Sequence, residues 1–176
     1  MSNYSAQLLR RDNWFLGSGE KMELTNIIIT TRVAHAGMTV REALQECIEQ
    51  QVSALPFCDE AQQVTGRVSV EGIFRFAGLP PDMVKSAHLL GDAIHHLNLT
   101  SDEVRQLLLQ PVEAMADETL PTLILSSPLV KALVVMESFD TDCLFLLEDG
   151  SYRGTVTRFN IARLMLKEHS DDSVLG

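Results

Sequence analysis

The sequence contains an internal repeat, and this feature constrains the fold more than any other. Residues 66–73 (GRVSVEGI) and residues 154–161 (GTVTRFNI) share a glycine, then a hydroxyl residue, then an isoleucine at the same spacing. A shift of 88 positions brings the two stretches into register. A repeat of this kind indicates two copies of one supersecondary unit. We therefore expect two similar halves that pack together about a pseudo-twofold axis.

The match continues upstream with a different offset. Ala43 and Leu44 fall on Ala132 and Leu133 when the shift is 89. One residue is therefore gained or lost between these positions and the matching stretches that end each copy.

The first copy has the pattern strand, helix, strand, strand, helix. Residues 27–31 (IIITT) are β-branched throughout and predict a short entry strand. Thr39 and Glu42 have the spacing of a capping box, and the apolar residues behind them recur at helical spacing. Residues 53–58 predict a buried strand and residues 64–70 the second strand of a hairpin. A second helix is expected to include Ile73.

The second copy has the same order with different capping residues. Ser126, Ser127 and Pro128 predict an N-cap with proline at the first helical position. Residues 143–147 predict a buried strand, and residues 153–157 predict its return strand. Asp149-Gly150 between them is typical of a tight hairpin.

Two regions lie outside the repeat. Residues 1–21 are mostly polar and form either an arm that docks on a partner subunit or a loose leader. The insert between the copies predicts two helices, one over residues 84–97 and one behind a capping box at Thr100. His88, His95 and His96 lie in the first of these helices. They are either metal ligands or, as we favour, solvated or interface histidines.

Composition narrows the classes of partner and compartment. The formal net charge is -10, so extended contact with nucleic acid or with an anionic membrane is disfavoured. No apolar run is long enough to span a bilayer, so no membrane insertion is expected, and the N-terminus does not resemble a secretory signal. Cys47, Cys58 and Cys143 lack metal-binding spacing. We interpret Cys47 and Cys143 as core residues of a reduced, cytoplasmic protein.

The turn within residues 154–161 is the candidate binding site. A strand that passes directly into a helix leaves unpaired backbone N–H groups at the start of the helix, and these suit an anion. Thr157 and Asn160 lie three residues apart and can offer hydrogen bonds to a phosphate and to a sugar hydroxyl. The alternative is that either side chain only caps the helix.

Positive charge also gathers in this part of the chain. Residues 150–167 contain no acidic residue but three arginines and a lysine. Either Arg153 or Arg158 contacts phosphate, or these side chains belong to a solvated face. Asp142, which a shift of 88 aligns with Ala54, can reach an adenine amino group or simply stand at the end of a strand.

These patterns together resemble those of a known family. They lie in the first copy at residues 39–44, 53–56, 59 and 66–69, and in the second copy at residues 132–133, 149–150 and 154–160. With these residues the sequence resembles a tandem pair of CBS domains, also called a Bateman module. The resemblance implies an α/β (α+β) fold. Two β-α-β-β-α repeats would pack about a pseudo-twofold axis, with a helical insert between them.

The resemblance also implies a function. CBS pairs resemble sensors rather than catalysts, and they bind adenosine-containing ligands such as AMP, ADP, ATP or S-adenosylmethionine in clefts between the paired domains. It further implies a homodimer formed through the CBS helices and an output protein whose identity is unknown.

The family pattern for each site is a glycine, two apolar residues, Ser or Thr, two residues and an aspartate. Ser69 and Thr157 match the hydroxyl position, which the resemblance assigns to phosphate contact. The acidic position, assigned to the ribose hydroxyls, holds Gly72 in the first copy and Asn160 in the second. An asparagine can still pair with hydroxyls, whereas a glycine has no side chain. The second site is therefore the better candidate.

The resemblance assigns the adenine pocket to the loop that contains Ala54 and Leu55. We include Cys143, beside Asp142, in the predicted site of the second copy. The expected organisation is an N-terminal arm at 1–21, a first repeat at 22–77, a helical insert at 78–111, a second repeat at 112–168 and a tail at 169–176.

Three classes of function follow. The favoured one is a stand-alone regulatory module that binds an adenosine-containing ligand and signals to a partner. The alternative is a structural dimerisation module whose ligand sites are degenerate, which Gly72 favours. An enzyme is not expected, because no catalytic triad, nucleophile elbow or paired carboxylate set is present.

Overall fold

The structure is a computed structural model that describes residues 24–78 and 100–170. The predicted N-terminal arm, the predicted first helix of the insert with its three histidines, and residues 171–176 of the predicted tail lie outside this range. The elements are, in chain order, η1 (Leu24–Ile27), β1 (Ala34–His35), α2 (Val40–Gln50), β2 (Ala54–Cys58), β3 (Val64–Ser69), α3 (Val70–Phe76), α6 (Ser101–Leu109), η3 (Val112–Met115), β4 (Thr122–Leu123), α7 (Leu129–Ser138), β5 (Cys143–Glu148), β6 (Ser151–Thr157) and α8 (Arg158–Ser170).

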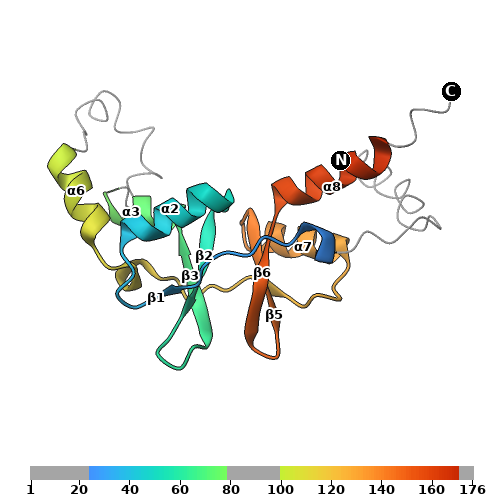
Figure 1. The fold of residues 1–176 in the computed structure, drawn as a ribbon, viewed down its shortest axis with the longest axis horizontal. Coiled ribbons are helices and arrows are strands. Elements are labelled where there is room, and N and C mark those ends of the chain that lie inside the picture. Colours follow the sequence, from blue (N-terminus) through green and yellow to red (C-terminus); the bar gives the residue numbers. More distant parts are fainter. Residues whose placement is uncertain (1–23, 79–99, 171–176) are drawn as a thin grey trace, which may run out of the picture.

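The two copies form two three-stranded sheets with the same topology within the described ranges. In each sheet the short first strand pairs parallel to the second, and the second pairs antiparallel to the third. Figure 1 shows the copies side by side, with the β2–β3 and β5–β6 hairpins at one end and the helices α2, α3, α7 and α8 at the other. The duplicated α+β fold predicted from the repeat is confirmed.

The strand register locates the one-residue change between the copies. Ala54 pairs with Ser69, and Cys143 pairs with Thr157. The counterpart of Ala54 is therefore Cys143, at a shift of 89, so the predicted alignment of Ala54 with Asp142 is wrong. The extra residue of the first copy lies in the β2–β3 turn, because Cys58 pairs with Val64 across a longer connection than the β5–β6 turn has.

The segment that leads into each copy packs against the other copy. Leu24 and Ile27 of η1 belong to the buried core of the second copy, whereas Val112 and Met115 of η3 belong to the core of the first. The strand predicted for residues 27–31 is wrong. Ile27 is the last residue of η1, and of the residues that follow it in this segment Ile29 alone makes an antiparallel bridge, to Thr155 of β6.

Two of the three predicted helix starts are confirmed. Thr39 and Thr100 each accept a hydrogen bond from the backbone N–H three residues later, and the Glu42 and Glu103 carboxylates complete both capping boxes. The pKa of each carboxyl is lowered by the hydrogen bond from the backbone of the capping threonine. The third start differs, because Pro128 is the extended N-cap residue of α7 rather than its first helical residue.

The hairpin predicted at Asp149-Gly150 is confirmed. Glu148 pairs with Ser151, so the loop has two residues, and both have positive φ, +51° at Asp149 and +76° at Gly150. These angles fit the turn class that matches the twist of two antiparallel strands.

A third cluster of buried side chains joins the two sheets. Ala54 of β2 packs with Cys143 and Phe145 of β5. The Phe145 and Tyr152 rings contact each other edge to face, with their centroids 6.4 Å apart. Burial raises the pKa of the Cys47 thiol to about 12 and also raises the pKa of the Cys143 thiol. These thiols therefore stay protonated at neutral pH, as expected of core cysteines.

In residues 24–78 and 100–170, no three His, Cys, Asp or Glu side chains lie where they could hold a metal ion. None of the helices in that part of the chain combines the length and apolar character that a bilayer span requires.

Candidate functional site

Each repeat ends in a strand that passes directly into a helix through a capping hydroxyl. Ser69 Oγ accepts a hydrogen bond from the Gly72 N–H at 2.9 Å at the start of α3. Thr157 Oγ1 accepts one from the Asn160 N–H at 3.1 Å at the start of α8. The capping role that the sequence left open for Thr157 is therefore present, and Thr157 is buried.

The Asn160 side chain joins the two copies. Its Nδ2 donates a hydrogen bond to the Ile27 carbonyl oxygen at 3.2 Å. The equivalent place in the first copy has no such contact, because Gly72 lacks a side chain. A Cβ atom added at Gly72 would lie 3.7 Å from the Met115 carbonyl oxygen. Met115 is thus the counterpart of Ile27 at the shift of 88. We call the space between Gly72 and Met115 the first crevice and the space between Asn160 and Ile27 the second crevice, and only the second has a side chain, that of Asn160, that bonds the opposite segment.

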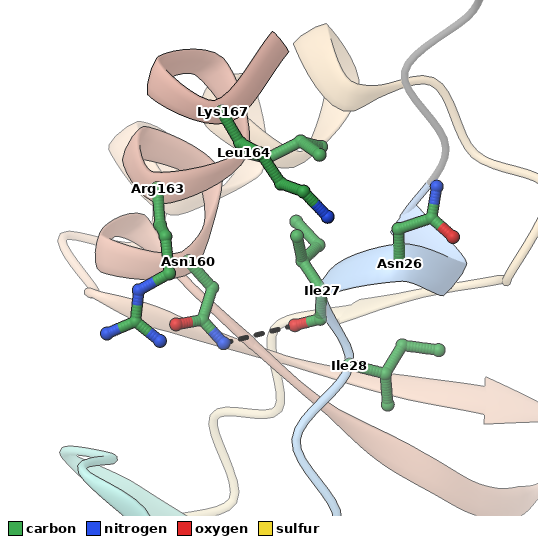
Figure 2. A pocket seen from close by; sticks show the side chains of 7 residues that line it. All are labelled: Asn26, Ile27, Ile28, Asn160, Arg163, Leu164 and Lys167. Atoms are coloured by element: carbon green, nitrogen blue, oxygen red, sulfur yellow. Dashed lines mark hydrogen bonds between the residues drawn. The ribbon is translucent and has the colours of Figure 1, made fainter. Parts of the chain in front are cut away.

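A hollow of about 580 Å³ lies where this segment meets α8. This volume falls within the range of roughly 300–1,000 Å³ that is typical of small-molecule sites. The hollow is lined by Asn26, Ile27, Ile28, Asn160, Arg163, Leu164 and Lys167. Figure 2 shows residues 26–28 on one side and the labelled α8 side chains on the other, with the hydrogen bond from Asn160 to the Ile27 carbonyl between them.

One face of α8 supplies four of the lining residues. Asn160, Arg163, Leu164 and Lys167 follow the i, i+3, i+4, i+7 spacing that places side chains on one side of a helix. Leu164 is buried with Ile27 in the core of the second copy, so it anchors this face. The hollow therefore combines apolar side chains with two amides, Asn26 and Asn160, and two cations.

The arginines predicted to contact phosphate are engaged elsewhere. Arg158 Nε donates to the Thr141 carbonyl oxygen at 3.3 Å, and its guanidinium forms ion pairs with Glu137 and Asp142. Arg153 Nε lies 3.2 Å from Glu148 Oε2 in the β5–β6 hairpin. Neither side chain lines the hollow described above.

Of the residues predicted for the adenine pocket, Ala54 and Cys143 lie in the cluster between the sheets, and Leu55 lies in the core of the first copy. Ala54, Leu55 and Cys143 are buried, and the Ser53 hydroxyl donates to Cys143 Sγ at 3.4 Å across the two copies. The Asp142 side chain is exposed and pairs with Arg158. Of the nine predicted site residues, Asn160 lines the hollow, and the other eight are not among its lining residues.

The site prediction did not include the two cations that the hollow contains. Arg163 and Lys167 belong to the basic stretch noted in the sequence, and their spacing from Asn160 was a usable signal, since three and seven residues place side chains on one helix face. Asn26 and Ile28 had no such signal, because their position depends on η1 crossing to the second copy.

Comparisons with known proteins were made by sequence and by structure. No protein-family model and no curated protein matches the chain. Among solved structures, a CBS domain-containing protein from Bacillus anthracis is similar at a TM-score of 0.58 and 22% identity, over 84% of this chain and 94% of that one.

Two further similar structures contain ligands. A CBS domain pair in complex with 5′-methylthioadenosine and S-adenosyl-L-methionine is similar at a TM-score of 0.56 and 16% identity, over 84% of this chain and 98% of that one. CBSX2 in complex with AMP is similar at a TM-score of 0.52 and 19% identity, over 81% of this chain and 95% of that one. At these identities the likeness establishes architecture, and the chain has the fold of a tandem CBS-domain pair.

Proposed function

We propose that the protein is a regulatory CBS pair that binds an adenosine-containing ligand, AMP, ADP, ATP or S-adenosylmethionine, without turning it over. The single observation that carries the proposal is the hollow between residues 26–28 and α8, with the Asn160 amide at its wall. The similar structures in complex with AMP and with S-adenosyl-L-methionine support it. The proposed repeats are residues 22–77 and 112–168.

Asn160 is suited to hold a ribose in this hollow. Its Nδ2 donates a hydrogen bond to the Ile27 carbonyl oxygen, but its Oδ1 accepts no hydrogen bond from any residue that the structure describes. An amide oxygen accepts hydrogen bonds from hydroxyl groups such as those of a ribose. The side chains of Ile27, Ile28 and Leu164 offer apolar surface for a purine base.

A ligand in this hollow would connect the two copies. Residues 26–28 lead into the first copy, whereas α8 ends the second. A ligand that contacts both favours the arrangement in which they lie together, and it shifts the population of conformers by as much as its affinity for them differs. This coupling is our proposed route to an output protein, and Phe159 and Met165, exposed on α8 outside the lining of the hollow, are available for contact with it.

Three other residues of the predicted site, Arg153, Arg158 and Thr157, could take part in binding without lining the hollow. Arg158 and Arg153 would contact phosphate only after exchanging their carboxylate partners. Thr157 would act by positioning Asn160. We propose that the first crevice, where Ser69 caps α3 beside Gly72, holds no ligand, and that each chain binds one.

We expect a thermal-shift titration with AMP, ADP, ATP and S-adenosylmethionine to raise the melting temperature with at least one of them. A ligand at about 100 times its dissociation constant adds about 2.7 kcal/mol to the free energy of unfolding. In Asn160→Ala the shift should be lost, because the proposed ribose contact is removed. Loss of the Nδ2 bond to Ile27 should cost about 1 kcal/mol in the free protein.

The matched control is Met165→Ala, an exposed side chain on the same helix that does not line the hollow. It should keep the ligand shift of the wild type. If Asn160→Ala keeps the shift as well, the hollow is not the binding site.

The second candidate function is a structural dimerisation module. Exposed apolar side chains on α7, at Val130, Leu133 and Val134, favour a homodimer formed through the CBS helices. A protein that dimerises but shows no shift with any of the four ligands at millimolar concentration would support this candidate over the sensor.

A further inference from the structure

We propose that the hollow selects adenosine ligands that carry a phosphate, so that it prefers nucleoside phosphates to neutral adenosine or to the sulfonium ligand S-adenosylmethionine. This inference rests on the proposed function and specifies the ligand class of the same site. Two cations, Arg163 and Lys167, carry it, with no acidic side chain among the lining residues.

The first argument is that these two cations have no carboxylate partner among the residues that the structure describes. Five arginines elsewhere in the two copies and the insert form ion pairs, namely Arg67, Arg75, Arg105, Arg153 and Arg158. Arg32, Arg41 and Lys131 also form no ion pair within residues 24–78 and 100–170, but none of them lines the hollow. Two unpaired cations that face one hollow without an acidic neighbour in its lining leave a local positive potential.

The second argument is the placement of the charges around Asn160. Figure 2 shows the Arg163 guanidinium beside the Asn160 amide, and the Lys167 side chain extending toward Ile27 and Asn26. Long side chains on a helix point back toward its N-terminus, which brings Lys167 toward the same opening. A ribose held by Asn160 would therefore place its 5′ substituent between two cations.

The third argument is chemical. A guanidinium and an ammonium bind phosphate oxygens through charge-assisted hydrogen bonds, which are stronger than bonds between neutral groups. S-adenosylmethionine has a sulfonium cation at the position where a nucleotide has its phosphate. Two cations at that position would repel the sulfonium and attract the phosphate, so the same side chains discriminate between the two ligand classes.

Isothermal titration calorimetry with ATP, AMP, adenosine and S-adenosylmethionine tests the inference. We expect the wild type to bind ATP and AMP more tightly than adenosine, and S-adenosylmethionine most weakly. Arg163→Ala/Lys167→Ala should weaken ATP binding by about tenfold or more, a loss of about 1.4 kcal/mol per factor of ten, and change adenosine binding by less than about twofold. Added salt should weaken ATP binding and leave adenosine binding nearly constant.

The matched control is Arg41→Ala/Lys131→Ala, which removes the same two residue types from exposed positions on α2 and α7. It should keep the ATP affinity of the wild type. Arg163 and Lys167 are exposed, so their removal should leave the fold intact, and adenosine binding by the variant provides a check on folding.

The outcomes separate this inference from the proposed function. Adenosine binding that depends on Asn160, together with equal affinities for ATP and adenosine, overturns the inference and leaves the adenosine site in place. An equal loss of ATP affinity in the control variant also overturns it, because net charge alone would then explain the effect. No binding of any of the four ligands overturns both.

Discussion

Replacing Phe145 with alanine is expected to lower the free energy of unfolding by about 3–5 kcal/mol, as is usual when a buried aromatic side chain is truncated. Phe145 is fully buried in β5 at the contact between the two sheets, beside Ala54, Cys143 and the Tyr152 ring. The cavity would therefore open between the two copies. Urea denaturation followed by circular dichroism measures the change.

The matched control is Phe159→Ala, because the Phe159 side chain on α8 is 83% exposed. It should change the free energy of unfolding by less than about 0.5 kcal/mol. Equal effects of the two substitutions would contradict a core that is shared between the sheets at Phe145.

Gly154→Ala is expected to lower the free energy of unfolding by about 2–4 kcal/mol, since overpacking and a strained φ each cost about 1–3 kcal/mol. Gly154 has a φ of +153°, and a Cβ atom there would collide with the Ile28 side chain. Relief of that collision moves Ile28 and breaks the paired hydrogen bonds of 2.8 Å between Ile29 and Thr155. Because Ile28 lines the hollow, ligand binding should fall as well.

Gly66→Ala is the matched control in the other copy. A Cβ atom at Gly66 would collide with the Asp117 carbonyl, next to the paired hydrogen bonds of 2.8 Å between Arg67 and Asp117. It should also destabilise the fold, but the hollow does not include this segment, so the variant should keep ligand affinity while folded. Loss of binding in both variants to the same extent would contradict the assignment of the site to residues 26–28.

Features fixed by neighbouring residues could be predicted from the sequence. The capping boxes at Thr39 and Thr100 and the turn at Asp149-Gly150 depend on contacts within three or four residues, so their patterns are visible in the chain. The shared strand order of the two sheets could be predicted from the repeat, because two copies of one unit are expected to fold with the same topology. These features account for the predicted duplicated α+β fold.

Features that depend on contacts between the copies could not be predicted in the same way. The β-branched residues 27–31 have strand propensity, but Leu24 and Ile27 are buried in the core of the second copy, η1 ends at Ile27, and only an isolated bridge at Ile29 follows. Tertiary packing here overrides local preference. The register error at Asp142 has a related cause, because strand pairing rather than sequence similarity decides which residue faces Thr157.

The candidate site likewise has parts that depend on neighbouring residues and parts that depend on contacts between the copies. Asn160 was predicted from the motif, whereas its bond to Ile27 and the hollow beside it require a segment 133 residues away in sequence. Arg153 and Arg158 were predicted for their charge, but nearby carboxylates pair with them. Arg163 and Lys167 became candidates once the structure showed which face of α8 meets residues 26–28.

A crystal structure of the protein grown with saturating AMP is the most direct test of the account. It should show one AMP per chain, in the hollow between residues 26–28 and α8, with the ribose hydroxyls within hydrogen-bonding distance of Asn160 and the phosphate near Arg163 or Lys167. AMP bound in the crevice at Gly72, or between the sheets near Cys143 with the hollow empty, would contradict it.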